Sequence, residues 1–387
     1  MSVYRFQTVN QIISGENSLQ SLGEHLYTVN RDIESALVVT QPFCLELDFI
    51  DTIKNQLQAR GIKVDVVTDI LPEPTVSNIE RVFQDICNEK YDVLIGIGGG
   101  SVLDATKILS VLKTNSQSIR DMLGTDLVES SGIPTVLIPT TSGTGSEVTP
   151  NAIVTIPDEE LKVGIVSRFL LPKLVILDPV LTLGLPKPIT AATGMDAFTH
   201  SLESFISNKA NPMSDMFALE SIRLISSSIV DAYQNGADIA AREKMLLGSM
   251  YGGMALTAAG TAAVHALAYP LGGKYGIPHG EANSMLLPHV MEVNMEAITE
   301  RLSLVAEPMG LTVSGLTPEE AAKQVVAQIV QWTETLNIPQ NLKKYGVQEE
   351  DLSALAVSAS KVKRLLDNNP KTLNLKEIES IYRKLLA

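Results

Sequence analysis

The sequence contains few of the features that characterise secreted, nucleic-acid-binding or membrane-spanning proteins. Only two cysteines, Cys44 and Cys87, occur in 387 residues, so no disulfide framework is implied and a reducing compartment fits. Asp and Glu (44) outnumber Lys and Arg (30), and the net charge of −14 argues against polyanionic partners. The first residues lack the apolar core of a signal peptide. These absences predict a soluble cytoplasmic protein that binds neither nucleic acid nor membrane.

Long apolar runs that are free of polar groups are also missing. Residues 250–278 are rich in apolar side chains, but they include His265, Lys274 and several glycines. Small residues mixed with polar groups predict a packed core helix and loop rather than a membrane span. Because 387 residues are many for one hydrophobic core, we expect two domains.

The two halves of the chain differ in periodicity. In the first half, β-rich runs alternate with helical patterns, which predicts a parallel sheet with strands at 36–40, 63–67, 92–97, 134–139 and 175–179. Helices are expected at 48–60 and up to Glu89, the second capped by Thr75 or Ser77. Later apolar spacings of three and four predict helices at 188–207, 212–234, 239–268, 318–336, 350–360 and 375–386. The sequence therefore predicts an α/β domain over 1–186 and an all-helical domain over 187–387.

Three of the five histidines fall between Gly194 and Gly280, in a stretch that also contains Asp196. Asp196 and His200 are four residues apart, so they share one helix face. His265 lies in a run of small apolar residues that would bury it, and His279 follows in a Gly/Pro loop. Any one histidine alone is more simply a core or surface residue. Together, one carboxylate oxygen and three imidazole nitrogens suit Fe(II) or Zn(II).

Two loops follow predicted strands and are rich in glycine or hydroxyl groups. Residues 98–101 read Gly-Gly-Gly-Ser before a helix, where a phosphate would meet free N–H groups. The spacing is not GxGxxG, so a βα turn without a ligand is the alternative for this motif alone. Residues 140–147 carry five hydroxyl side chains and two glycines. Because both loops leave the carboxyl ends of strands, a bound nucleotide is predicted.

Ordered motifs along the whole chain resemble the iron-containing (group III, metal-dependent) alcohol dehydrogenase family. They are PEPT at 72–75, GGGSxxDxxK at 98–107, PTTSGTGSE at 139–147, LDP at 177–179, GMDAxxHxxE at 194–203, HALAYPLGG at 265–273, PHGxxN at 278–283 and the NP pair at 369–370. The resemblance implies a dehydroquinate synthase-like architecture, with a Rossmann-like parallel-sheet nucleotide-binding domain followed by an all-α metal-binding domain. It implies hydride transfer between NAD(P)(H) and a small primary alcohol or aldehyde, in a homodimer or a larger homo-oligomer.

The same resemblance implies roles for individual residues. The metal ligands would be Asp196, His200, His265 and His279. The cofactor-binding residues would be Gln41, Glu73, Gly99, Gly100, Ser101, Asp104, Thr140, Thr141, Thr144, Lys162 and Leu181. Asn151 and Leu256 fall where the family has substrate-pocket residues. Lys162 lies in an expected hairpin after 152–154, and its spacing alone would equally suit a solvated lysine.

Three positions depart from the family pattern. Tyr269 replaces a histidine proposed as a proton relay, and since tyrosine titrates near pH 10, the sequence leaves open whether it transfers protons or orients the ligand. Gln41 replaces an aspartate that binds the ribose, so both NAD and NADP stay open. Lys363 replaces an acidic residue next to Arg364, and these cations could recognise an anionic group on the aldehyde or form a solvated helix face.

Three other functions compete with a dehydrogenase. One is a hydroxyacid–oxoacid transhydrogenase of the same fold that retains its cofactor. A second is a lyase resembling dehydroquinate synthase, which the GMDAxxH and HALAY motifs fit poorly. The third is a metal-stabilised binding protein without activity.

Overall fold

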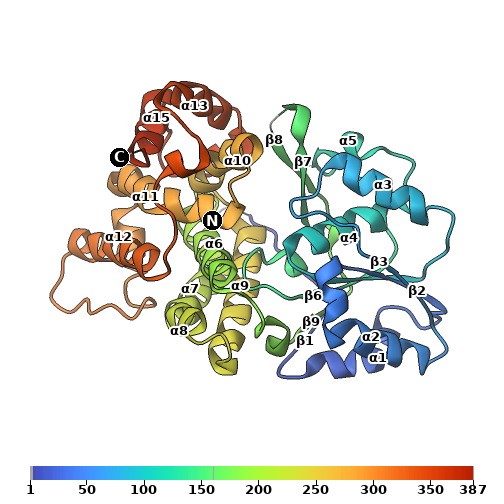
Figure 1. Cartoon of the computed structure of the whole chain (residues 1–387). Helices are drawn as coiled ribbons and strands as arrows, with labels where there is room; N and C mark the ends of the chain where they lie inside the picture. The colour runs from blue at the N-terminus through green and yellow to red at the C-terminus, as the bar shows by residue number, and fades with distance from the viewer. Residues whose placement is uncertain (1–2, 160, 387) are drawn as a thin grey trace. The chain divides into compact units, whose positions relative to one another are not determined.

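The computed structural model describes residues 3–159 and 161–386. The chain divides into two compact units (Figure 1). The sheet unit comprises Gln7–Thr141 and Gly145–Gly184, and the helical unit comprises Ser142–Thr144, the chain from Leu185 onward and the described residues up to Phe6. Each unit has its own hydrophobic core.

A six-stranded parallel sheet forms the centre of the sheet unit, as predicted. Its strand order is β1 (Gln11–Ser14), β9 (Leu174–Leu177), β6 (Thr135–Pro139), β4 (Val93–Gly98), β2 (Ser35–Val39) and β3 (Lys63–Val67). Every residue of β4 is buried, because helices cover both faces of the sheet.

Alternate side chains of the strands enter two separate cores. Leu37, Val39 and Leu94 belong to a cluster with residues of α3 (Val76–Ile86) and α4 (Gly100–Leu112). Ala36, Val38 and Ile95 point the other way, into a cluster with residues of α1 (Leu22–His25) and α2 (Asp48–Gln58). Figure 1 shows the two helical layers on opposite faces of the strands.

A smaller sheet carries the predicted hairpin. Its strand order is β5 (Gly124–Thr125), β8 (Leu161–Val166) and β7 (Asn151–Ile156), and β7 pairs with β8 in antiparallel fashion. Lys162 on β8 lies opposite Thr155 on β7. At the start of α3, Thr75 is the residue that caps the helix, since its side chain accepts a hydrogen bond from Asn78 N.

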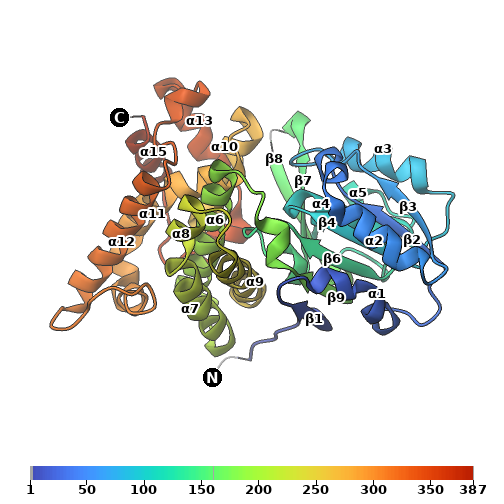
Figure 2. The same cartoon turned by 60° about the horizontal axis from the view of Figure 1, so that its bottom comes forward.

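The described part of the helical unit contains ten α-helices, labelled α6 to α15. Their bounds are Lys187–Ile206, Pro212–Ser226, Ile229–Gln234, Ile239–Ala259, Ala263–Tyr275, His279–Ser303, Pro318–Thr335, Leu352–Ser360, Lys363–Leu366 and Leu375–Lys384. Figure 2 shows α6 beside α7 and α9, which are its main packing partners together with α11.

The structure corrects three sequence predictions in this unit. The helix predicted over 212–234 is broken between α7 and α8, where Ser228 leaves helical geometry with a φ of −144°. The helix predicted over 239–268 is two helices, α9 and α10, bent by 107° after Gly260, whose φ of +72° suits glycine. His279 is not in a loop, because it is the first residue of α11.

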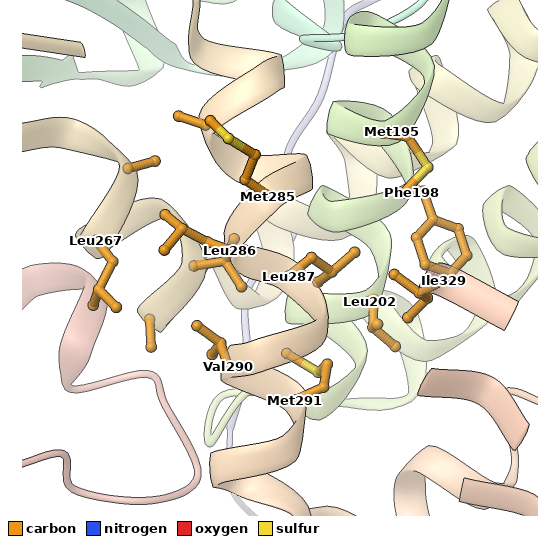
Figure 3. Close-up of a cluster of buried hydrophobic side chains, with 14 of the residues drawn as sticks. Met195, Phe198, Leu202, Leu267, Met285, Leu286, Leu287, Val290, Met291 and Ile329 are labelled. Atoms are coloured by element: carbon orange, nitrogen blue, oxygen red, sulfur yellow. The ribbon is translucent and has the colours of Figure 1, made fainter. Parts of the chain in front are cut away.

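The core of the helical unit surrounds α6, in which every residue from Gly194 to Ile206 is buried. Figure 3 shows Met195, Phe198 and Leu202 of α6 close to Leu287 of α11 and Ile329 of α12. The edge of the Trp332 indole faces the Phe198 ring, with centroids 5.1 Å apart. Among the described helices, none is by itself long and apolar enough to cross a membrane, and the bent pair of α9 and α10 reaches that threshold only as a pair.

Candidate functional site

The four predicted metal ligands come together in the helical unit. Asp196 and His200 leave adjacent turns of α6, His265 lies in the first turn of α10, and His279 begins α11. One ligand atom from each residue lies within 4.8 Å of the others. Asp196 Oδ1 is 3.9 Å from His200 Nε2, 3.9 Å from His265 Nε2 and 3.7 Å from His279 Nε2. The ligand atoms therefore surround one point.

This cluster fits a divalent ion. A tetrahedral site with bonds near 2.1 Å has ligand atoms about 3.4 Å apart, slightly less than the distances found here. Asn283 Nδ2 lies 2.7 Å from Asp196 Oδ1, 3.2 Å from His265 Nε2 and 3.1 Å from His279 Nε2. Its two protons cannot satisfy three acceptors at once, and a cation would complement the same acceptors. The donor set suits iron or zinc.

Burial and charge keep the ligands in their metal-binding forms. Burial by itself would raise the pKa of Asp196, but His200, His279, His265 and the hydrogen bond from Asn283 bring it below the usual range. Burial lowers the pKa of His200, although Asp196 opposes this effect. An ionised carboxylate and a neutral imidazole are the forms that bind metals.

Two polar residues next to the ligands escaped the sequence analysis. Glu203, one turn after His200 on α6, is fully buried, and its Oε2 lies 2.6 Å from His265 Nδ1. Asn283 lies one turn after His279 on α11 and is also fully buried. Glu203 is the last residue of the motif GMDAxxHxxE, and Asn283 is the last residue of PHGxxN. Each lies three or four residues after a predicted ligand, and this helical spacing could have indicated that its side chain lies next to that ligand.

The other predicted residues of the helical unit lie in different surroundings. Tyr269 is buried, and its ring centroid is 6.1 Å from that of His279. Leu256 is half-buried on α9, and Thr144 is half-buried in the short segment that belongs to this unit. Lys363 and Arg364 are exposed at the start of α14, where neither side chain forms a hydrogen bond or ion pair with the described residues.

Two predicted nucleotide loops leave neighbouring strands of the large sheet. Strands β4 and β6 are adjacent and parallel, with Gly98 opposite Pro139. Thr140 N donates to Gly98 O over 3.0 Å, and a Cβ on Gly99 would touch Thr141 Cγ2 at 3.4 Å. The two loops therefore lie close together, and the N–H groups at the N-terminus of α4, where Gly99 and Gly100 lie, have no side-chain cap and would favour an anion.

The strand order also marks this edge of the sheet. Strands β2 and β4 are neighbours in the sheet. After β2 the chain adds β3 on the outer side of β2, whereas after β4 it adds β6 on the opposite side of the pair. Ligands of open α/β sheets bind where the order reverses in this way. Gln41 lies two residues after the end of β2, and its side-chain amide donates to Ile70 O over 3.1 Å.

Ser101, Glu73 and Lys162 form one connected group. Ser101 Oγ accepts a hydrogen bond of 3.0 Å from Glu73 N, and Glu73 Oε1 lies 2.7 Å from Lys162 Nζ. Glu73 has a φ of +51°, an uncommon conformation for a residue with a side chain. Lys162 is buried, so it is not the solvated lysine that its spacing alone allowed. Leu181 is buried in the short helix Pro179–Thr182.

A buried charged network lies beneath the second loop. Lys107 Nζ donates to Ser146 Oγ (2.8 Å), Thr149 O (3.0 Å) and Asn151 O (2.7 Å), and Asp104 Oδ2 accepts from Ile153 N (2.9 Å). Burial lowers the pKa of Lys107 to about 8 and raises the pKa of Asp104. Burial also raises the pKa of Glu147 to about 7. Asp104 therefore acts on the segment that carries Asn151, a role its motif did not reveal.

Comparison with known proteins gives one family for both units. Residues 10–179 match the family model for iron-containing alcohol dehydrogenase, and residues 190–386 match the C-terminal model of the Fe-containing alcohol dehydrogenase family. The chain is 40% identical over 354 residues to long-chain-alcohol dehydrogenase 1 of Geobacillus thermodenitrificans, covering 91% of this chain and 89% of that protein. The crystal structure of a 1,3-propanediol oxidoreductase superposes with a TM-score of 0.95 at 34% identity, with both chains fully covered. A sulfoacetaldehyde reductase from Bifidobacterium kashiwanohense, in complex with NAD+, superposes with a TM-score of 0.86 at 26% identity over all of both chains.

Proposed function

The chain belongs to the iron-containing alcohol dehydrogenase family, and from this premise we propose a role for each group of site residues. The protein is a metal-dependent oxidoreductase that transfers hydride between a nicotinamide cofactor and an alcohol or aldehyde. We assign nucleotide binding to residues 1–186 and metal binding to residues 187–387. The cluster of one aspartate and three histidines is the observation that carries the assignment.

We assign the metal to Asp196, His200, His265 and His279. When bound, the ion supplies a Lewis acid for the oxygen of the alcohol or aldehyde. The chain itself holds the four ligand atoms around one point and keeps them largely out of water, since only His279 has more than a tenth of its side chain exposed, at 27%. Tyr269, next to His279, is assigned to orient the substrate oxygen through a hydrogen bond, with Leu256 and Asn151 as further substrate contacts.

We assign the cofactor to the edge of the sheet where β2, β4 and β6 end. Gly99, Gly100 and Ser101 would bind the pyrophosphate at the N-terminus of α4, because free N–H groups there favour an anion. Lys162, oriented by Glu73, would bind a ribose or a phosphate. The remaining contacts would come from Gln41, Asp104, Thr140, Thr141, Thr144 and Leu181. We expect NAD to be the preferred cofactor. We also expect NADP to bind, because Gln41 carries no negative charge that would repel its 2′-phosphate.

A metal reconstitution assay tests this function. The protein is stripped with chelator, Fe(II) or Zn(II) is added without oxygen, and oxidation of NADH and NADPH is followed with small aldehydes. Turnover should return with metal and be lost in His265→Ala. Metal binding without nicotinamide oxidation on any aldehyde would contradict a dehydrogenase. Exchange between a hydroxy acid and an oxo acid without added nicotinamide would instead establish the transhydrogenase.

We propose that the substrate includes aldehydes with an anionic group, bound by Lys363 and Arg364. Their exposure and lack of partners among the described residues leave them available, and the likeness to a sulfoacetaldehyde reductase supports this substrate class. An exposed ion pair contributes about 1 kcal/mol, so Lys363→Ala should raise the KM for an anionic aldehyde about fivefold. The KM for a neutral aldehyde should not change, nor should either KM in Lys376→Ala, a control at another exposed lysine. Equal changes for both aldehydes would refute the assignment.

We further propose that the enzyme is a cytoplasmic homodimer or larger homo-oligomer. Family membership supports the assembly, and the low cysteine content supports a reducing compartment. Sedimentation equilibrium over a range of protein concentrations measures the assembly, and a constant monomer mass would exclude it.

A further inference from the structure

Glu203 is a buried carboxylate whose two oxygens are both used at the start of α10. Oε1 accepts a hydrogen bond of 2.6 Å from Val264 N, and Oε2 lies 2.6 Å from His265 Nδ1. The side chain is fully buried. Burying a carboxylate is costly unless its oxygens are hydrogen-bonded, and here each oxygen has a partner.

The first of these contacts attaches one helix to another. The residue before α10, Ala262, has no side chain that can cap the helix, so the first N–H groups of α10 have no local acceptor. Glu203 of α6 supplies the missing acceptor, and its negative charge suits the N-terminus of a helix. Ser204 on α6 and Ser207, the residue that follows α6, donate to the carbonyls of Gly260 and Ala259 at the bend before α10. The end of α6 thus sets where α10 begins.

The second contact decides which nitrogen of His265 faces the other ligands. His265 Nδ1 satisfies a carboxylate oxygen only if it carries the ring proton, and Nε2 then keeps a free lone pair. Nε2 is the atom that lies 3.9 Å from Asp196 Oδ1. The tautomer imposed by Glu203 is therefore the one that a metal ion needs.

His200 offers a comparison within the same site. Its buried Nδ1 has no carboxylate partner among the described residues, and the ring interacts with the backbone of Gly143 instead, so no carboxylate holds it in the same manner. Its position comes from α6 itself, which also carries Asp196 one turn earlier. His265 comes from a different helix and needs a separate link to α6, which Glu203 provides.

We propose that Glu203 is a positioning residue for the metal centre, docking α10 on α6 and holding His265 with Nε2 directed at the ion. This inference rests on the proposed metal site and goes beyond the four ligands. A carboxylate of this kind behind a ligating histidine typically changes metal affinity 10- to 100-fold when it is removed.

Zinc affinity of the full-length chain tests the proposal. Metal-free protein is titrated with Zn(II) against a competing fluorescent chelator, for wild type and Glu203→Gln. The glutamine keeps the size of the side chain but offers one acceptor instead of two, and its NH2 group would face His265 Nδ1. The dissociation constant should rise about 10- to 100-fold. Asp215→Asn, which removes a carboxylate paired with Arg301 in the same unit, should leave it unchanged.

A second measurement does not depend on the variant folding. In metal-free wild-type protein labelled with 15N-histidine, the NMR spectrum should show His265 protonated at Nδ1. An Nε2-protonated His265, or a zinc affinity of Glu203→Gln within twofold of wild type, would overturn the proposal. Failure of wild-type protein to bind zinc at all would instead overturn the proposed metal site.

Discussion

Glu147 gives the sheet unit a dependence of stability on pH that a single substitution should remove. Its side chain is 2% exposed, and Oε1 has no hydrogen-bond partner among the described residues. Burial raises its pKa from 4.5 to about 7, although Lys107 opposes this effect. The folded protein therefore keeps a proton that the unfolded chain releases between pH 4.5 and 7.

The sign of the effect follows from this difference. Since the pKa is higher in the folded state, the free energy of unfolding falls as pH rises through the interval. A difference of about 2.5 in pKa corresponds to about 3.4 kcal/mol in full, and about 2.5 kcal/mol of this arises between pH 5 and pH 8. Glutamine resembles the protonated acid at every pH. Glu147→Gln should therefore gain about 2.5 kcal/mol relative to wild type from pH 5 to pH 8.

Urea unfolding of metal-free wild type and Glu147→Gln at several pH values measures this difference. Groups that titrate equally in both proteins cancel in the comparison. Glu220→Gln is the control, because the hydrogen bond from Arg223 lowers the pKa of Glu220, so its difference from wild type should stay nearly constant from pH 5 to pH 8 and change, with the opposite sign, only below the unfolded pKa of 4.5. Parallel stability curves for wild type and Glu147→Gln would refute the reasoning about Glu147.

Three further predictions concern the metal, a helix cap and a close backbone contact. Zn(II) at a hundredfold excess over its dissociation constant should stabilise the protein by about 2.7 kcal/mol and raise the Tm in calorimetry, whereas an unchanged Tm would exclude binding to the folded state. Thr75→Ala should cost about 1 kcal/mol in urea unfolding, because it removes the bond to Asn78 N, and Thr75→Ser should restore it; equal stability of all three would exclude the cap. Gly280→Ala would drive a Cβ into the Ala192 carbonyl oxygen, displace His279 and weaken zinc binding at least tenfold, whereas Gly184→Ala meets no atom and should bind as wild type does. Equal zinc affinity of the two glycine variants would show that α11 yields without moving His279.

Elements that depend on local patterns were predicted well. The strand predicted at 63–67 has those bounds in the structure, and the strand predicted at 92–97 differs by one residue at each end. Such strands are short apolar segments between turn residues, so neighbouring side chains largely determine them. The residue types of the candidate metal ligands could also be predicted from the sequence. A divalent ion is bound by only a few residue types, and these occur at characteristic spacings.

Other features required contacts between residues far apart in the sequence. The apolar spacing of 239–268 continues through Gly260, so the sequence pattern predicts one helix. The segment forms two helices because Gly260 adopts a positive φ and the chain packs against α6. The role of Lys107 follows from acceptors about forty residues later in the chain, at Ser146 and Asn151. A period of 3.6 residues describes one helix and contains no information about which partner that helix meets.

By itself, the sequence determined the alternation of strands and helices, the glycines at the end of β4 and the placing of Asp196 and His200 on one helix face, since each depends on residues near one another in the chain. The tertiary structure alone decided which nitrogen of His265 faces Asp196, because that depends on Glu203 from another helix. It also decided the burial of Glu147 and Lys107, since desolvation is a property of the assembled unit and not of a segment.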